Sequence, residues 1–260
     1  MDRATAVSLA EWLNRAEVEK REVTRITEQY PELTVEDAYQ IQEVLVGKKL
    51  EQGYRIVGPK MGLTSRAKMK QMNVEEPIYG FIFDYMVVSG GEISFRDLIH
   101  PKVEAEIAFV LRRDIEGPGV TGAQVLAATA HVMSALEIID SRYERFHFTL
   151  PDVIADNASS SRVVFGTTLK RPDELELDLV GVTLSINGEL KEMGAGAAVL
   201  GHPANSVAML ANMLARKGLK LKAGQTILTG GITGAVMLQP GDAVSARLDG
   251  LGSVGFLVRA

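Results

Sequence analysis

Cysteine is absent from the 260-residue sequence. This absence excludes disulfide frameworks, thiolate metal sites and cysteine nucleophiles, and it suits a reducing compartment. Any metal in this protein must therefore be held by oxygen or imidazole ligands.

An excess of positive charge and long apolar runs are also absent. The 28 Lys and Arg residues are scattered and are outnumbered by 33 Asp and Glu residues, which gives a net charge of −5. Nucleic acid is therefore not an expected partner. No apolar run approaches the ~18 residues of a membrane span, and residues 1–15 lack the apolar core of a signal peptide. We expect a cytoplasmic protein without a membrane segment.

Several catalytic and cofactor-binding motifs are missing as well. The sequence has no Walker-type GKS or GKT, no dinucleotide-binding glycine fingerprint, no G-x-S-x-G and no histidine pair at metal-binding helical spacing. These absences disfavour nucleotide-dependent enzymes, serine hydrolases and zinc proteases. We interpret His131 and His202 as structural, and we expect His100 to lie near the acidic strand described below.

What is present is an ordinary globular composition, with 46% hydrophobic and 23% charged residues. Apolar residues recur at helical spacing over residues 4–19, and Thr34 with Asp37 forms a capping-box pattern that predicts a helix over residues 34–53. From Arg55 onward, short apolar runs interrupted by glycine are typical of β structure. We expect an N-terminal helical part, residues 1–75, and a β-rich catalytic domain, residues 76–260.

The β-rich part contains recognisable elements. Asn187-Gly188 predicts a hairpin turn of type I′, because both residues tolerate positive φ. Helices are expected over residues 65–72, 121–130 and 204–217. Strands are expected over residues 55–61, 102–111, 132–139, 162–167, 181–186, 226–229, 243–248 and 253–258.

The segment KVEAEIAFVL, residues 102–111, places two carboxylates on one strand face. Strand alternation sends Glu104 and Glu106 to the same side as Lys102. One interpretation is a solvated strand face on which Lys102 is the partner of the two acids. The other is a pair of oxygen ligands for a divalent cation such as magnesium.

Glu137 is a third acid in an unusual place. It lies within the apolar run VMSALEII, where an ionised carboxylate is costly unless a cation or a hydrogen-bond network compensates. It could instead point outward from a half-buried strand. Spacing alone does not join Glu137 to the other two glutamates, and Asp140 and Asp156 are competing candidates for a third or outer ligand.

Lys60 stands in the apolar segment IVGPKMGLT between two glycines that permit close backbone approach. It could meet an anionic substrate, or it could protect an exposed edge strand. The glycines of segments 194–196 and 229–233 could let backbone amides contact a carboxylate.

Six segments, in order along nearly the whole chain, resemble the hydratase and decarboxylase branch of the fumarylacetoacetate hydrolase superfamily. They are residues 56–64, 100–109, 135–142, 155–160, 200–203 and 228–233. The resemblance implies an α+β fold with a mixed, curled, barrel-like β-sheet and an N-terminal helical α/β part. It also implies that Glu104, Glu106 and Glu137 are metal ligands and that Lys60 is the catalytic lysine. We expect the ion to be Mg²⁺ or Mn²⁺, and we take Ser159, Ser160 and the backbone near Gly230 and Gly231 as candidate contacts of a substrate carboxylate.

Within that branch, residues 58–65, 100–102 and 230–233 are more similar to the decarboxylases than to the hydratases. Hydrolysis is disfavoured, because no histidine precedes His100 where the carbon–carbon hydrolases of the family carry a His-Glu dyad. The resemblance implies metal-dependent conversion of a dicarboxylate, 2-oxohex-3-enedioate, to 2-hydroxypenta-2,4-dienoate and CO₂ in the meta-cleavage degradation of aromatic compounds. The alternatives are hydration of that dienoate (vinylpyruvate hydratase activity) and a non-catalytic subunit of a decarboxylase–hydratase complex. A complex with the hydratase and a homo-oligomer are also implied.

Overall fold

The computed structural model describes residues 1–65, 69–70 and 75–260, and the helix expected over 65–72 lies largely outside them. The chain begins with three helices, α1 (Arg3–Glu19), α2 (Ile26–Gln29) and α3 (Val35–Glu51). The predicted capping box is confirmed, because the Thr34 side chain accepts from the Asp37 amide while the Asp37 side chain accepts from the Thr34 amide. The buried residues of α1, among them Leu9 and Leu13, form the apolar face that the sequence predicted.

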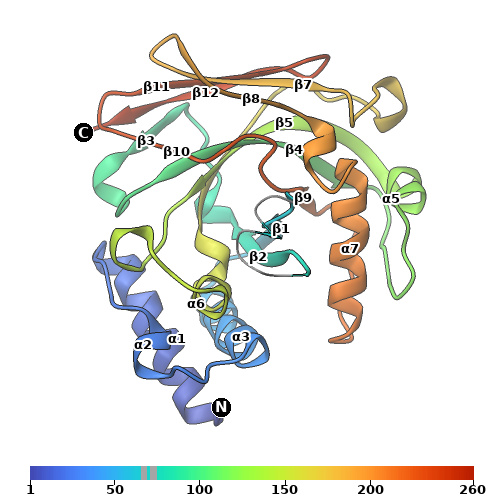
Figure 1. Ribbon diagram of the computed structural model, residues 1–260. Coiled ribbons are helices and arrows are strands. Elements are labelled where there is room, and N and C mark those ends of the chain that lie inside the picture. The colour runs from blue at the N-terminus through green and yellow to red at the C-terminus, as the bar shows by residue number, and fades with distance from the viewer. Residues whose placement is uncertain (66–68, 71–74) are drawn as a thin grey trace.

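The larger sheet carries the acidic strand. Its strand order is β2 (Ile78–Phe83), β1 (Ile56–Gly62), β9 (Thr226–Leu228), β4 (Lys102–Leu111), β5 (Thr129–Ile139) and β6 (Ser160–Phe165), and β10 (Val236–Met237) pairs with β4 as well. All pairs in it are antiparallel except β1 with β9. Figure 1 shows β4 and β5 as long, strongly curved strands that wrap around β1 and β2.

A smaller sheet lies over the outside of β4 and β5 (Figure 1). Its order is β3 (Glu92–Ser94), β12 (Gly252–Arg259), β11 (Ala243–Leu248), β7 (Gly181–Ile186) and β8 (Glu189–Ala195). Along β11 every second residue is buried, as expected for a strand that packs one face on another layer. The apolar side of β4, including Val103, Ile107 and Phe109, is fully buried, and strand alternation turns the glutamates to the opposite side of the larger sheet.

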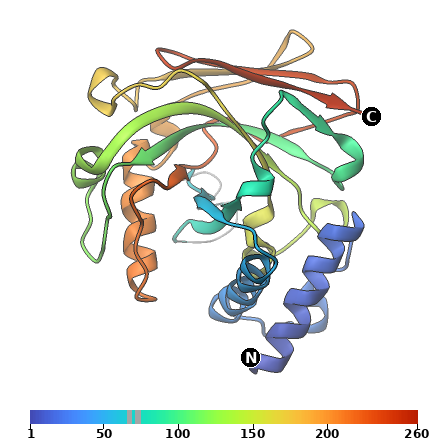
Figure 2. The same cartoon turned by 180° about the vertical axis from the view of Figure 1, so that it is seen from behind.

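The remaining helices are α5 (Gly122–Ala128), α6 (Leu150–Ala155) and α7 (Pro203–Ala215). Seen from behind in Figure 2, α1 and α3 lie at the end of the molecule opposite the smaller sheet. The buried Gln42 of α3 ties them to the rest, since its amide donates to the carbonyls of Tyr79 in β2 and Ile154 in α6. Short 3₁₀ turns cover residues 84–86, 95–97, 144–146, 157–159, 172–174 and 196–198.

The predicted α+β class with a curled sheet is confirmed, as are all eight expected strands and the Asn187-Gly188 turn, where φ is 55° and 79°. Three short strands, β2, β3 and β10, and two short helices, α2 and α6, had not been predicted. The division at residue 75 stays a prediction; β1, which precedes it, joins the same sheet as strands that follow it. Among the described helices, none is long and apolar enough to cross a membrane.

Candidate active site

The three predicted glutamates come together on one face of the larger sheet. In the β4–β5 register Glu104 lies directly opposite Glu137, and Glu106 follows on the same face of β4. One carboxylate oxygen from each residue lies within 4.8 Å of the others. Glu106 and Glu137 have no exposed surface and Glu104 has 8%. The solvated-face interpretation is therefore wrong, and so is the outward orientation considered for Glu137.

The electrostatics of this cluster are unfavourable without a cation. Burial raises the pKa of Glu106 well above its usual value, and the charges of Glu137 and Glu104 add to the increase. Burial also raises the pKa of Glu137, against the opposing effect of the nearby Lys60 ammonium. Within the described part of the chain, Glu106 Oε1 and Glu137 Oε2 have no hydrogen-bond partner, and Glu137 Oε1 forms an ion pair with Lys60 but no hydrogen bond. Oxygen atoms left in this state fit a divalent cation, which takes carboxylate ligands.

Lys60 supplies a positive charge beside the cluster. It lies on β1, an internal strand between β2 and β9, and it is 3% exposed, so the edge-strand interpretation is wrong. Its Nζ is 3.0 Å from Glu137 Oε1 and donates to the Ala158 carbonyl at 3.0 Å. The neighbouring Gly58 is required by packing, because a Cβ there would lie 1.9 Å from the Thr226 carbonyl oxygen of β9.

The segment 229–233 follows β9 and runs along β4. The Gly230 amide donates to Glu106 Oε2 at 2.8 Å and so orients one of the three carboxylates. A Cβ at Gly231 would lie 2.6 Å from Glu104 Oε2. Both glycines thus touch the carboxylate cluster itself, while their expected contact with substrate stays a prediction.

The Ala158 carbonyl that meets Lys60 belongs to an unusual turn, which we call the 157–159 turn. Asn157, Ala158 and Ser159 all have left-handed backbone conformations, with φ of 48°, 52° and 57°. For residues other than glycine each such conformation costs about 1–2 kcal/mol. The Asn157 side chain offsets part of this cost by pairing with the Phe81 backbone, donating to its carbonyl at 2.9 Å and accepting from its amide at 2.8 Å.

The two predicted serines occupy this turn and its end. The Ser160 hydroxyl donates to the Asn157 carbonyl at 2.7 Å and so braces the turn. The Ser159 hydroxyl is buried and has no hydrogen-bond partner among the described residues. The role of both in substrate binding stays a prediction.

The two competing acids are engaged elsewhere. The Asp140 carboxylate accepts from the amides of Ile99 and His100 at 2.8 Å each. The Asp156 carboxylate accepts from the backbone and side chain of Arg142. Asp140 and Asp156 are therefore bound to protein donors, and neither belongs to the cluster of Glu104, Glu106 and Glu137.

The histidines lie outside the carboxylate cluster. His202 is the N-cap of α7, where its Nδ1 accepts from the Ala204 amide at 3.0 Å, which confirms a structural role. His131 is exposed on β5. His100 pairs through Nδ1 with Glu22 at 2.7 Å and contacts the Phe146 ring.

Two features near the site were missed by the sequence analysis, the Ala158 carbonyl that meets Lys60 and the buried Arg142. A backbone carbonyl leaves no signal in a sequence. Arg142 lies three residues after the end of β5 and is 3% exposed in the structure, which is unusual for arginine.

Comparison with known proteins agrees with this geometry. Residues 54–259 match the family described as fumarylacetoacetate (FAA) hydrolase C-terminal. A 4-oxalocrotonate decarboxylase from Pseudomonas putida is 50% identical over 255 residues, which are 98% of this chain and 97% of that protein. A 2-keto-4-pentenoate hydratase from Paraburkholderia xenovorans is 41% identical over 246 residues, 94% of this chain and 91% of the hydratase.

A solved structure is similar over the whole chain. It is the 4-oxalocrotonate decarboxylase from Pseudomonas putida G7 complexed with magnesium and adipate, with a TM-score of 0.97 and 48% identity over 99% of this chain and 98% of that one. These likenesses support an enzyme of the carboxy-lyase class. The chain thus belongs to the fumarylacetoacetate hydrolase family, in the branch that contains decarboxylases and hydratases.

Proposed function

We propose that this protein is a divalent-metal-dependent decarboxylase that converts 2-oxohex-3-enedioate (4-oxalocrotonate) to 2-hydroxypenta-2,4-dienoate and CO₂. The observation that carries the proposal is the buried cluster of Glu104, Glu106 and Glu137 beside Lys60. The 50% identity to a 4-oxalocrotonate decarboxylase supports the choice of reaction.

Glu104, Glu106 and Glu137 are the proposed metal ligands, and Mg²⁺ or Mn²⁺ is the proposed ion. A hard cation of this kind takes carboxylates and leaves positions for water and substrate oxygens. The related structure that contains magnesium also contains adipate, a six-carbon dicarboxylate like the proposed substrate. This supports a dicarboxylate as the substrate class.

The reaction needs a place for an electron pair. When the C5–C6 bond breaks, its electrons form the C4=C5 bond, the C3=C4 pair moves to C2=C3, and negative charge develops on the C2 oxygen. A bound divalent cation supplies Lewis acidity that stabilises this charge. A proton on the C2 oxygen then completes the enol of 2-hydroxypenta-2,4-dienoate.

Lys60 is the proposed catalytic residue of the chain itself. Its ammonium group is held between the Ala158 carbonyl and Glu137, at 3.0 Å from each, and so keeps a fixed place beside the carboxylates. From there it stabilises the developing oxyanion or delivers the proton to it. We further propose that the Ser159 hydroxyl, which has no hydrogen-bond partner among the described residues, contacts a substrate carboxylate together with Ser160, Gly230 and Gly231.

The test compares two reactions of the purified protein. Metal-free protein receives Mg²⁺ or Mn²⁺, and CO₂ release from 2-oxohex-3-enedioate is measured beside hydration of 2-hydroxypenta-2,4-dienoate. We expect metal-dependent CO₂ release with little hydration. Hydration without CO₂ release would assign the chain to the hydratases, which it resembles at 41% identity. Neither reaction, in a protein that binds no metal, would favour a non-catalytic subunit.

The context of the reaction is also a proposal. The dienol product is short-lived, so an enzyme that consumes it should follow directly, and we propose a physical complex with the vinylpyruvate hydratase in the meta-cleavage degradation of aromatic compounds. We also propose a homo-oligomer and a cytoplasmic location. Co-purification of the two enzymes from coexpressing cells tests the complex, and its absence at micromolar concentrations contradicts it.

A further inference from the structure

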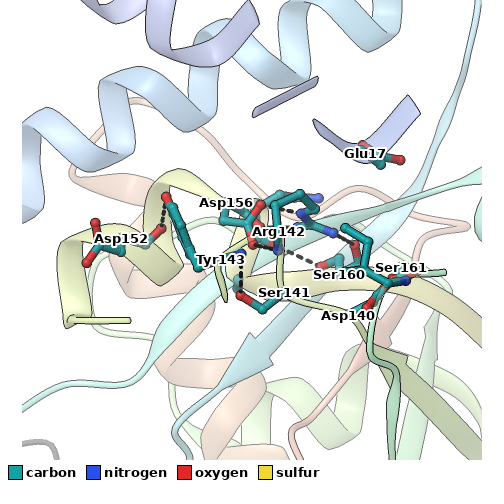
Figure 3. Close-up of polar contacts among 12 residues, drawn as sticks. Glu17, Asp140, Ser141, Arg142, Tyr143, Asp152, Asp156, Ser160 and Ser161 are labelled. Carbon is teal, nitrogen blue, oxygen red and sulfur yellow. Dashed lines mark hydrogen bonds and ion pairs between the residues drawn. The ribbon is translucent and has the colours of Figure 1, made fainter. Parts of the chain in front are cut away.

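A buried arginine lies behind the turn that holds Lys60. Arg142 follows β5, and Figure 3 shows its guanidinium between Asp156 and Ser160. Its Nε pairs with the Asp156 carboxylate, its Nη2 donates to the Asp156 carbonyl at 2.5 Å, and its Nη1 donates to the Ser160 carbonyl at 3.1 Å. The Arg142 amide donates to the other Asp156 carboxylate oxygen at 3.1 Å. One side chain therefore binds both ends of the 157–159 turn.

The 157–159 turn connects this arginine to the catalytic lysine. Its three left-handed residues lie between the two carbonyls that the guanidinium binds, and its middle residue offers the Ala158 carbonyl to Lys60 Nζ at 3.0 Å. A strained turn persists only where its surroundings hold it. A planar guanidinium can bind two carbonyls and a carboxylate at once, which the ammonium of lysine cannot do with the same geometry.

Glu17 of α1 adds negative charge near Arg142. Figure 3 shows Glu17, near the end of α1, above Arg142 in that view, with no hydrogen bond or ion pair drawn between them. Glu17 is fixed by Lys49 of α3 at 2.9 Å and by the Tyr85 hydroxyl at 2.7 Å. Burial lowers the pKa of Arg142, but the negative charges of Asp156, Glu17 and Asp140 outweigh it, so this pKa is raised.

We propose that Arg142, paired with Asp156, is a positioning residue for Lys60: by clamping the 157–159 turn it sets the Ala158 carbonyl, and thereby the place of the Lys60 ammonium beside Glu137. The inference rests on the proposed catalytic role of Lys60. It gives the buried Arg142–Asp156 pair a part in turnover without contact between Arg142 and substrate.

The test replaces Arg142 by lysine, which keeps the positive charge but removes the planar guanidinium that binds two carbonyls and a carboxylate. We expect kcat to fall by about 10- to 100-fold, because small misplacements of a catalytic group cost up to about 100-fold. The affinity for Mg²⁺ should stay within about 3-fold, since Arg142 touches none of the three glutamates. In a crystal structure of the variant, Lys60 Nζ should lie beyond hydrogen-bonding distance of the Ala158 carbonyl, with the glutamate cluster unchanged.

Arg162→Lys is the matched control. Arg162 lies on β6, is partly buried, and donates to the Ser161 carbonyl at 2.9 Å, and it forms no ion pair within the described ranges. Its replacement should leave kcat within about 2-fold, because Arg162 binds neither end of the 157–159 turn and does not contact Lys60.

A double-mutant cycle separates positioning from mere stabilisation. In a Lys60→Met background, Arg142→Lys should lower the residual rate by less than about 3-fold, since the group that it positions is gone. The proposal is overturned if Arg142→Lys lowers kcat by the same factor in both backgrounds. It is also overturned if Arg142→Lys keeps a kcat close to wild type and an unchanged 157–159 turn. If Arg142→Lys does not accumulate as folded protein, Asp156→Asn loosens the same clamp from its other side and is judged by the same criteria.

Failure of the proposed function gives a different result. A wild type that hydrates the dienoate instead of releasing CO₂ refutes the decarboxylase assignment, and the Arg142 comparison is then made on hydration. If the wild type has neither activity, the deciding measurement is the distance from Lys60 Nζ to the Ala158 carbonyl in the crystal structure of Arg142→Lys.

Discussion

Replacing Glu106 by glutamine distinguishes a metal site from a structural acid by the sign of its effect on stability. Glutamine keeps the volume and one oxygen for the Gly230 amide but removes a buried charge. In chelator, wild-type Glu106 is repelled by Glu137 and Glu104 and is desolvated. The variant should therefore melt at or above the wild-type temperature when no metal is present.

Magnesium should reverse that order. At a magnesium concentration of 100 Kd, binding adds about 2.7 kcal/mol to the wild type, or about 5–10 °C for a domain of this size. Outer-sphere changes alone weaken metal sites by about 10- to 100-fold. If the loss of a ligand charge costs about 100-fold, the same magnesium concentration adds only about 0.4 kcal/mol to the variant, or about 1–2 °C.

Thermal melts of both proteins, each with chelator and with magnesium, measure these shifts, and Glu17→Gln is the contrasting control. Glu17 has cationic and hydroxyl partners, Lys49 and Tyr85. Removal of its charge should lower stability by about 1–3 kcal/mol in chelator and should leave the magnesium shift intact. The reasoning is refuted if Glu106→Gln behaves like Glu17→Gln.

Three further predictions follow from the same site. The pKa values of Glu106 and Glu137 are raised, so protons compete with the cation for these carboxylates. Calorimetry should therefore find that Mg²⁺ affinity rises with pH and that protons are released on binding. In chelator, the free energy of unfolding should fall as pH rises above the usual carboxyl range, because the folded state then binds more protons than the unfolded state. A Mg²⁺ affinity that does not change between pH 5 and pH 8 would contradict this prediction. Lys60→Met should lower kcat by at least about 100-fold yet keep or increase Mg²⁺ affinity, since a cation beside Glu137 is removed; steady-state kinetics near the wild-type values contradict it. In Gly231→Ala the new Cβ would lie 2.6 Å from Glu104 Oε2, so it should displace that carboxylate and weaken Mg²⁺ binding in a titration. The control is Gly47→Ala on α3, where a Cβ meets no atom within 4 Å. It should raise the free energy of unfolding by about 0.5–1 kcal/mol without changing Mg²⁺ affinity.

The sequence predicted the parts of the fold that local patterns determine. The capping box at Thr34, the Asn187-Gly188 turn and the alternation along β4 are signals that neighbouring residues create themselves. The short strand β2 was missed although it pairs with β1 along its length. Its sequence, IYGFIF, contains a glycine that weakens a strand pattern, and that glycine is required by tertiary packing, because a Cβ at Gly80 would lie 2.4 Å from the Asn157 carbonyl oxygen.

The charged residues of the site could be predicted from the sequence, but the backbone turn that holds Lys60 in place could not. The spacing of Glu104 and Glu106 predicts that they share one face of a strand. Glu137 joins them only through the β4–β5 register, which this spacing does not encode. The resemblance to a known family made that connection. The 157–159 turn has no local signal, since Asn157, Ala158 and Ser159 are held in left-handed conformations by contacts from other segments.

The central claim is that Glu104, Glu106 and Glu137 bind one divalent cation, and an electron paramagnetic resonance titration with Mn²⁺ tests it most directly. For metal-free wild type we expect one tight Mn²⁺ per chain, displaced by Mg²⁺. For Glu106→Gln we expect affinity weakened by at least about 100-fold under the same conditions. Equal Mn²⁺ binding by the two proteins, or no tight site in the wild type, would contradict the account.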